Sequence, residues 1–177
     1  MSNSLEELLQ QGYQARREHR SADARLLFAE AVDIARKAQA PLDLAKAVTA
    51  MGSIERDMKN HDAALQNYGE AVAIYRSAGD ELRLAHAIRH IGDIYLEAGQ
   101  FPPAEPCYVE ALRIYRGNPN TDPLDLANSI RGFALLNEEL GKREEARRLW
   151  EEARTLYATV NVEAGVKESE RRIAQLV

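Results

Sequence analysis

Two histidines and an aspartate in the middle of the chain have the spacing of a metal site. His86 and His90 are one helical turn apart, which places both imidazoles on one face of a helix, and Asp93 follows within the next turn. Such a face can supply ligands to zinc. The segment HAIRH lacks the glutamate that a zinc protease needs, and no third and fourth ligand is evident in the sequence. We therefore interpret the histidines as polar surface residues and predict no metal and no cofactor.

Motifs for nucleophilic or phosphate chemistry are absent from the sequence. It contains no GxxxxGK[ST] loop, no GxSxG elbow and no CxxC pair. Cys107 is the single cysteine and lies near the expected start of a helix, where a thiol pKa can be lowered. Its counterparts in neighbouring repeats are Asn67 and Leu149, which indicates an inert side position. The sequence therefore predicts a protein without enzymatic activity.

Arginine side chains offer another kind of chemistry, the binding of carboxylates. A guanidinium can donate two parallel hydrogen bonds to one carboxylate. Arg89 and Arg131 are candidates for this role. They are separated along the chain by the same number of residues as Tyr115 and Tyr157, which indicates that both pairs occupy equivalent positions of a repeated segment. Their function therefore depends on the repeated elements that position them.

The sequence consists of four copies of one segment. Gly12, Gly52 and Gly92 are separated from one another by equal numbers of residues along the chain. The same step relates Ala24, Ala64 and Ala104, the aromatic residues Phe28, Tyr68 and Tyr108, and then Ala31, Ala71 and Ala111. A fourth copy follows after a slightly longer step, with Ala146, Trp150 and Ala153. The extra length falls in the loop 117–123, where an insertion is tolerated.

Each copy predicts two helices, because its apolar residues recur at helical spacing. Helix starts are indicated by Ser4 with Glu7, a capping-box pattern, and by Asp122 before a proline. Helix ends are indicated by glycines that suit a left-handed cap, at positions 79, 99 and 141. A ninth helix is expected over residues 162–176, with Val162, Val166, Ile173 and Leu176 on its apolar side, which would cap the last repeat.

A lone helix pair of this kind cannot bury its apolar stripe, so neighbouring pairs must stack. We predict an all-α fold, a right-handed superhelical α-solenoid of four helix pairs plus a C-terminal capping helix. It would form one domain over residues 1–177. Its repeats are expected at about 5–44, 45–84, 85–126 and 127–160, with the capping helix at about 162–176.

The pattern resembles the tetratricopeptide repeat (TPR). The resemblance rests on a glycine in the first helix, then an alanine, an aromatic residue and an alanine, and it is best in the third copy: Gly92, Tyr95, Ala104, Tyr108 and Ala111. The usual first-helix tryptophan is absent, and arginine replaces the usual proline after the second helix, at Arg36, Arg76 and Arg116. The period exceeds that of the common repeat and resembles the longer repeats of kinesin light chains and of bacterial peptide-sensing regulators. The resemblance implies a scaffold that binds peptides or proteins.

In that family the first helix of each pair lines the concave groove. The helical wheel independently places polar residues there, opposite the apolar stripe. The peptide-binding candidates are Lys46, Thr49, Ser53, Arg56, His86, Arg89, His90, Asp93, Asn128 and Arg131. Basic groups lie toward the N-terminal ends of these helices and acidic groups toward the C-terminal ends. One interpretation is a solvated face with weak ion pairs. The other is a groove in which Arg89 and Arg131 bind an acidic segment.

Composition limits the partners. With 23 Lys and Arg against 28 Asp and Glu, the formal net charge is −5, which argues against general binding of nucleic acid or anionic membrane. No apolar run reaches the length of a membrane span, and no secretory signal is expected at the first residues. We expect a cytoplasmic protein.

The leading functional prediction is a non-enzymatic scaffold that binds a protein or peptide partner. One alternative is a sensor or regulatory module that acts in trans with a transcription regulator or an enzyme. The other is self-association, for example as a homodimer, through an apolar face that includes Val166, Ile173, Leu176 and Val177.

Overall fold

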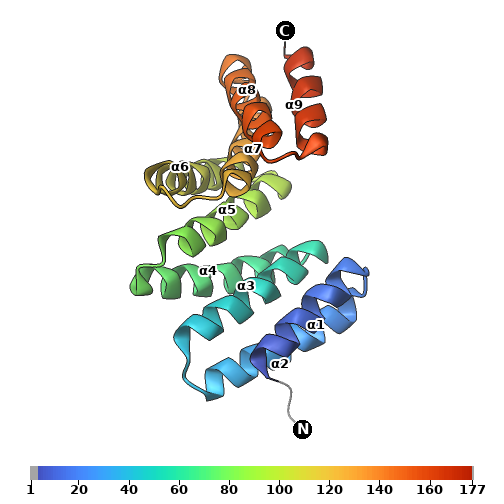
Figure 1. The fold of residues 1–177 in the computed structure, drawn as a ribbon, viewed down its shortest axis with the longest axis vertical. Helices are drawn as coiled ribbons and strands as arrows, with labels where there is room; N and C mark the ends of the chain where they lie inside the picture. The colour runs from blue at the N-terminus through green and yellow to red at the C-terminus, as the bar shows by residue number, and fades with distance from the viewer. Residues whose placement is uncertain (1–3, 177) are drawn as a thin grey trace. The chain divides into compact units, whose positions relative to one another are not determined.

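The computed structural model describes residues 4–176, and in this range every regular element is an α-helix (Figure 1). The prediction of an all-α fold is therefore confirmed. Val177, one of the residues named for self-association, lies outside the described residues. The helices are α1 (Leu5–Arg17), α2 (Ser21–Lys37), α3 (Pro41–Asp57), α4 (His61–Ala78), α5 (Glu81–Glu97), α6 (Phe101–Gly117), α7 (Pro123–Glu139), α8 (Arg143–Thr159) and α9 (Glu163–Gln175). None of the helices within residues 4–176 combines the length and the apolar character needed to cross a bilayer.

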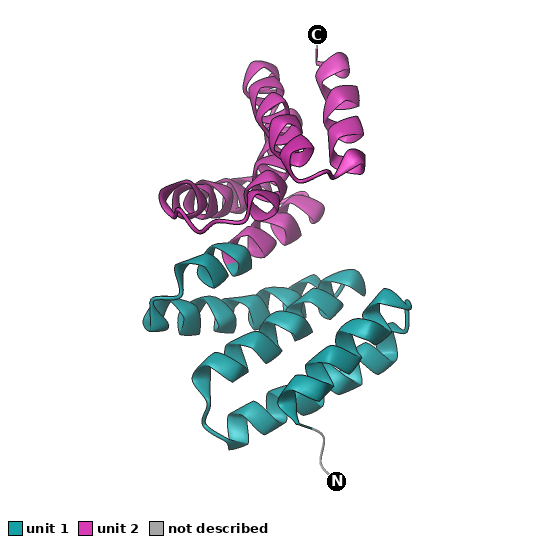
Figure 2. Ribbon diagram, in the orientation of Figure 1, with its two compact units in different colours: residues 1–87 teal, residues 88–177 magenta. Residues whose placement is uncertain are grey.

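The chain forms two compact units, which are described separately (Figure 2). Unit 1 comprises residues 1–87 and unit 2 residues 88–177, so the boundary falls within α5. In unit 1, α2 packs against α1 and α3, and α3 packs against α4. In unit 2, α7 packs against α6 and α8, and α8 packs against α9. Within each unit, each helix therefore packs mainly against the helices next to it in the sequence.

Helix ends lie where the sequence places them. The Ser4 hydroxyl accepts a hydrogen bond from the Glu7 amide, and the Glu7 carboxylate accepts one from the Ser4 amide at 2.9 Å, which completes the predicted capping box. Asp122 caps α7 by accepting a hydrogen bond from the Leu124 amide at 2.8 Å. The expected glycine caps at positions 79, 99 and 141 have φ angles of 69–70°.

Three turns of unit 1 use other residues in the same left-handed conformation, at His19, Gln39 and Lys59. His19 and Lys59 have φ angles of 59° and 64°, and they occupy the repeat position of Gly99 and Gly141. A side chain with a Cβ is strained in this region, whereas glycine is not.

We expect His19→Gly to raise the free energy of unfolding by about 0.5–1 kcal/mol, because relief of this strain exceeds the added flexibility of the unfolded chain. Thermal unfolding followed by circular dichroism measures the effect. Gly79→Ala, at another left-handed position of unit 1, should shift the midpoint downward. A lower midpoint for His19→Gly would contradict the strain argument.

Close packing of glycine against an aromatic ring joins the two helices of a pair. A Cβ atom at Gly52 would lie 2.8 Å from the Tyr68 ring, and one at Gly92 would lie 3.3 Å from the Tyr108 ring. Gly12 is in similar contact with Phe28. The repeated glycines are therefore needed for the close approach of the first helix to the ring of the second.

The residue that faces each ring varies with the polarity of the ring. Tyr68 forms a hydrogen bond of 2.8 Å with Ser53, and Tyr108 donates one of 2.7 Å to Asp93. Phe28 has no hydroxyl, and the matching position holds Tyr13, whose ring meets it edge-on at 5.2 Å. The buried hydroxyls of Tyr68 and Tyr108 are thus paired, as buried polar groups usually are.

The last helix closes the core of unit 2. The partly buried side chains of Val162, Val166, Ile173 and Leu176 pack against a cluster that contains Trp150 and Tyr157. The predicted capping role of this helix is therefore confirmed.

Polar contacts also hold the last helix in place. Arg172 of α9 donates a hydrogen bond of 3.0 Å to Glu138, and Glu138 accepts another from the Trp150 indole. The guanidinium of Arg172 lies 5.9 Å from the centre of the Trp150 ring, within the range of a cation–π contact. One carboxylate therefore links three helices of unit 2.

Two of the three arginines that replace the usual proline have a structural role. Arg36 of α2 donates a hydrogen bond to Glu70 of α4 at 2.7 Å, and Arg116 of α6 pairs with Glu152 of α8 at 2.8 Å. Each pair links second helices of successive repeats within one unit. Since the side chains are about half exposed, each pair adds at most about 1 kcal/mol.

Candidate functional site

The polar candidates on first helices divide between the two units. Unit 1 holds Lys46, Thr49, Ser53, Arg56 and His86, and unit 2 holds Arg89, His90, Asp93, Asn128 and Arg131. We call the second set the unit 2 face. No group of three metal-binding side chains comes together among the described residues 4–176.

The unit 1 candidates on α3 are held by local contacts. Lys46 forms an ion pair with Asp43 at 3.0 Å, and the Thr49 hydroxyl donates to the backbone carbonyl of Ala45 at 2.7 Å. Ser53 is buried and bonded to Tyr68. Arg56 and His86 are partly buried. The polar side chains of α3 therefore combine support of the core with partial exposure.

Arg89 and Asp93 form the buried part of the unit 2 face. Arg89 is 8% exposed and Asp93 9%, and the guanidinium donates to the carboxylate at 2.9 Å. Asp93 Oδ1 accepts the hydrogen bond of Tyr108. His90 Nδ1 lies 3.4 Å from Asp93 Oδ2, the oxygen that also binds Arg89. The charge of Arg89 is thus matched within its own helix.

Burial shifts the acid groups around Arg89. It raises the pKa of the Tyr115 hydroxyl far above its ordinary value, although the charge of Arg89 opposes this. Burial also raises the pKa of Asp125, again against Arg89. Arg89 Nε and Tyr115 Oη are buried and form no hydrogen bond of normal geometry with the described residues. Two donors on this side of unit 2 therefore lack an acceptor within residues 4–176.

Asn128 and Arg131 of α7 form the more open part of the unit 2 face. Tyr157 donates a hydrogen bond of 2.8 Å to the Asn128 carbonyl oxygen, and burial raises the pKa of Tyr157 to about 12, so it remains a donor. Since the Asn128 oxygen is the acceptor, the side-chain NH₂ retains its N–H groups for other partners. Arg131 binds Glu168 of α9 through hydrogen bonds of 2.7 and 2.9 Å. This contact raises the pKa of Arg131 and lowers that of Glu168.

Both arginines predicted to bind an acidic segment therefore carry a carboxylate of their own chain, Asp93 or Glu168. Sequence periodicity did not assign Glu168 to the face, because its helix does not follow the repeat pattern of the first helices. It also missed Arg16 of α1, which binds Asp57 of α3 through hydrogen bonds of 2.5 and 3.1 Å. Arg16 and Asp57 are separated along the chain by nearly the length of one repeat, and this spacing was the signal in the sequence that could have identified the pair.

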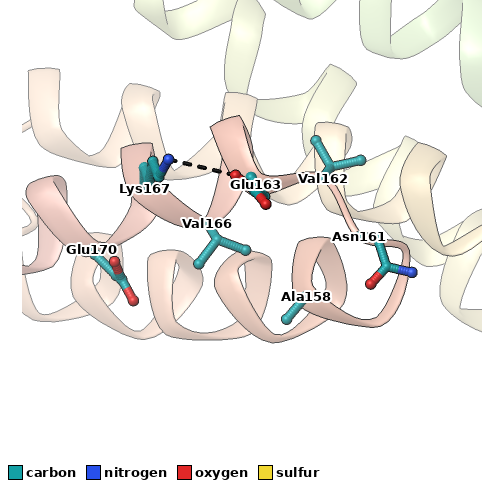
Figure 3. A pocket seen from close by; sticks show the side chains of 7 residues that line it. All are labelled: Ala158, Asn161, Val162, Glu163, Val166, Lys167 and Glu170. Carbon is teal, nitrogen blue, oxygen red and sulfur yellow. Dashed lines mark ion pairs between the residues drawn. The ribbon is translucent and has the colours of Figure 1, made fainter.

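A small pocket of about 280 Å³ lies where α8 meets α9 (Figure 3). Ala158, Val162 and Val166 give it an apolar part, and Glu163 and Lys167 form an ion pair of 3.5 Å beside them. The paired side chains are 86% and 76% exposed, so the ion pair is weak.

Cys107 lies in α6, where its thiol donates a hydrogen bond to the Pro103 carbonyl oxygen at 3.3 Å. Burial, with a smaller contribution from Glu110, raises the thiol pKa to about 11. The helix start thus fails to lower this pKa, which supports the interpretation of an inert thiol.

We expect the folded protein at mildly alkaline pH to react with an aromatic disulfide reagent about a hundredfold more slowly than the urea-unfolded chain, because only the thiolate reacts. The rate should rise as the pH approaches 11, where the thiol loses its proton. Equal rates for the folded and unfolded chain would contradict the shift.

Comparison with solved structures finds helical proteins of low sequence identity. BtubC (BKLC) from P. vanneervenii is 18% identical with a TM-score of 0.79, covering 89% of this chain and 64% of that chain. A Rap protein complexed with competence and sporulation factor is 13% identical with a TM-score of 0.82, covering 97% and 48%. The apo form of RapI is 13% identical with a TM-score of 0.83, covering 93% and 60%. The chain therefore spans about half to two thirds of these structures, and the likeness concerns the fold.

Comparison with curated proteins gives no match. A family model described as tetratricopeptide repeat matches residues 43–117 and 85–159. Together these matches include the second, third and fourth copies of the repeat. Because they extend over more than half of the sequence, the chain belongs to the tetratricopeptide repeat family.

Proposed function

We propose that this protein is a non-enzymatic scaffold that binds a peptide segment of a partner on the unit 2 face. The observation that carries the proposal is the fixed position of polar side chains that remain partly exposed. Tyr157 orients Asn128 and Glu168 orients Arg131, so these side chains lose little conformational entropy when a segment binds.

The face has the donors that an extended segment requires. A peptide backbone offers carbonyl oxygens at regular intervals, and Asn128 and Arg131 lie nearly one helical turn apart on α7. The Rap protein of similar fold is complexed with a factor, which supports a ligand-binding role for this architecture. Membership of the repeat family supports the broader role in protein–protein interaction.

Selection of short random peptides against the intact chain tests the proposal. Enriched peptides are synthesised with a fluorescent label, and their dissociation constants are measured by anisotropy. Asn128→Ala/Arg131→Gln should weaken binding by about tenfold or more, the equivalent of one or two hydrogen bonds. Circular dichroism and Trp150 fluorescence verify that the variant is folded.

The matched control is Asn120→Ala/Arg113→Gln, which changes the same residue types at exposed positions outside the unit 2 face. This variant should bind the selected peptides as the unmodified chain does. Failure to enrich any peptide, or equal loss of binding in both variants, would refute the proposed function.

A further inference from the structure

A pocket of about 600 Å³ opens in unit 1 where α1 and α3 end. Its walls come from the last turns of α1, the turn that follows it, and the end of α3 with its turn. The side chains that matter here are Tyr13, Arg16, Arg17, His19, Asp57 and Lys59. Three chain segments therefore converge on one concave site.

The pocket differs in charge from the chain as a whole. Arg16, Arg17 and Lys59 are cations at neutral pH, whereas Asp57 is the single carboxylate in the lining. The pocket therefore has a net charge of about +2, while the chain has −5. An anionic ligand would be drawn to this site rather than to the average surface.

Two contacts at the pocket show how its arginines are held. Arg16 is bound to Asp57 through both carboxylate oxygens. Arg17 donates to the neutral amide oxygen of Gln14 at 2.6 Å, which leaves its positive charge uncompensated by that contact. Tyr13 also lines the pocket; it is 36% exposed, and its ring meets that of Phe28 edge-on.

The repeat pattern does not require these cations. Glu97 and Glu139 occupy the repeat position of Arg17, and Gly99 and Gly141 occupy that of Lys59. Lys59 moreover has a φ of 64°, a conformation in which glycine would be less strained. The backbone of the repeat therefore gives no reason for basic residues at these two positions.

We propose that the unit 1 pocket binds a carboxylate side chain of an acidic peptide segment. A carboxylate fits better than a phosphate, because the repulsion from Asp57 is stronger for a doubly charged group than for a singly charged one. Arg16 is already paired with the Asp57 carboxylate, so it offers less compensation for a second negative charge on the ligand. The negative charge of the whole chain disfavours nucleic acid or an anionic membrane as the source. The inference rests on the proposed function, since it names the chemistry of a segment that the scaffold binds.

The test uses two labelled peptides of equal length, oligoglutamate and oligoglutamine, and the intact chain. Oligoglutamate should bind, with an affinity that falls as salt is added, and oligoglutamine should not. Arg17→Gln/Lys59→Gly should weaken oligoglutamate binding about fivefold, as expected for loss of two exposed charge contacts. Because glycine suits position 59, the midpoint of thermal unfolding should not fall, so weaker binding cannot result from unfolding.

The control is Arg148→Gln/Lys167→Gly, which removes the same charges at side chains that are 70% and 76% exposed in unit 2. It should bind oligoglutamate like the unmodified chain. Absence of oligoglutamate binding, or equal weakening in both variants, would overturn the inference. Peptides selected on the unit 2 face would still bind in that case, which separates this failure from a failure of the proposed function.

Discussion

Replacement of Tyr108 by alanine is expected to lower the free energy of unfolding by about 3–5 kcal/mol. The Tyr108 side chain is fully buried between Gly92 and Gly132, and it also packs against Phe133 with ring centres 6.0 Å apart. Two glycines cannot fill the space that the ring leaves, so a cavity persists. The loss also removes the hydroxyl that donates to Asp93.

Urea unfolding followed by the fluorescence of Trp150 measures this effect, because the single tryptophan is fully buried in the same unit. Tyr108→Phe keeps the ring and removes only the hydroxyl, and should cost about 1–2 kcal/mol. If alanine were tolerated as well as phenylalanine, the ring would not be the centre of the repeat packing.

Asp93→Ala should lower the free energy of unfolding by about 3–5 kcal/mol, through a different cause. The substitution leaves the buried Arg89 guanidinium without its carboxylate and the Tyr108 hydroxyl without its acceptor. A buried guanidinium that has lost its hydrogen-bonded carboxylate destabilises the folded chain, whereas a paired one does so far less.

The control is Glu152→Ala, which breaks the half-exposed pair with Arg116 and should cost less than about 1 kcal/mol. In a Tyr108→Phe background, Asp93→Ala should cost about 1 kcal/mol less than in the unmodified chain, because the lost hydrogen bond is then shared between the two substitutions. Equal effects of Asp93→Ala and Glu152→Ala would contradict the buried network.

The repeat spacing was sufficient to predict the helices and their ends. Positions such as Gly52 and Tyr68 recur because each pair must bring one ring against one first helix, and that requirement leaves a periodic record in the sequence. Caps were predictable because Ser4 and Asp122 act through neighbours in the chain.

The pairing of charges was predictable only in part. Helical periodicity identifies the side of the helix on which Arg131 lies, but its rotamer and its partner are decided in three dimensions. Glu168 belongs to a capping helix outside the repeat register, so no spacing in the sequence relates it to Arg131. The basic pocket of unit 1 was missed because Arg16 and Lys59 lie at the end of a helix and in a turn, outside the polar stripe that the helical wheel traces.

We propose that a peptide segment binds to the first helices α5 and α7 rather than to the second helices α6 and α8. Amide chemical-shift mapping of the isotopically labelled chain with a selected peptide tests it most directly. We predict shifts along α5 and α7, including those of Asn128 and Arg131, with little change around Arg113 on α6. Shifts confined to α6 and α8, or no saturable shifts, would contradict the claim.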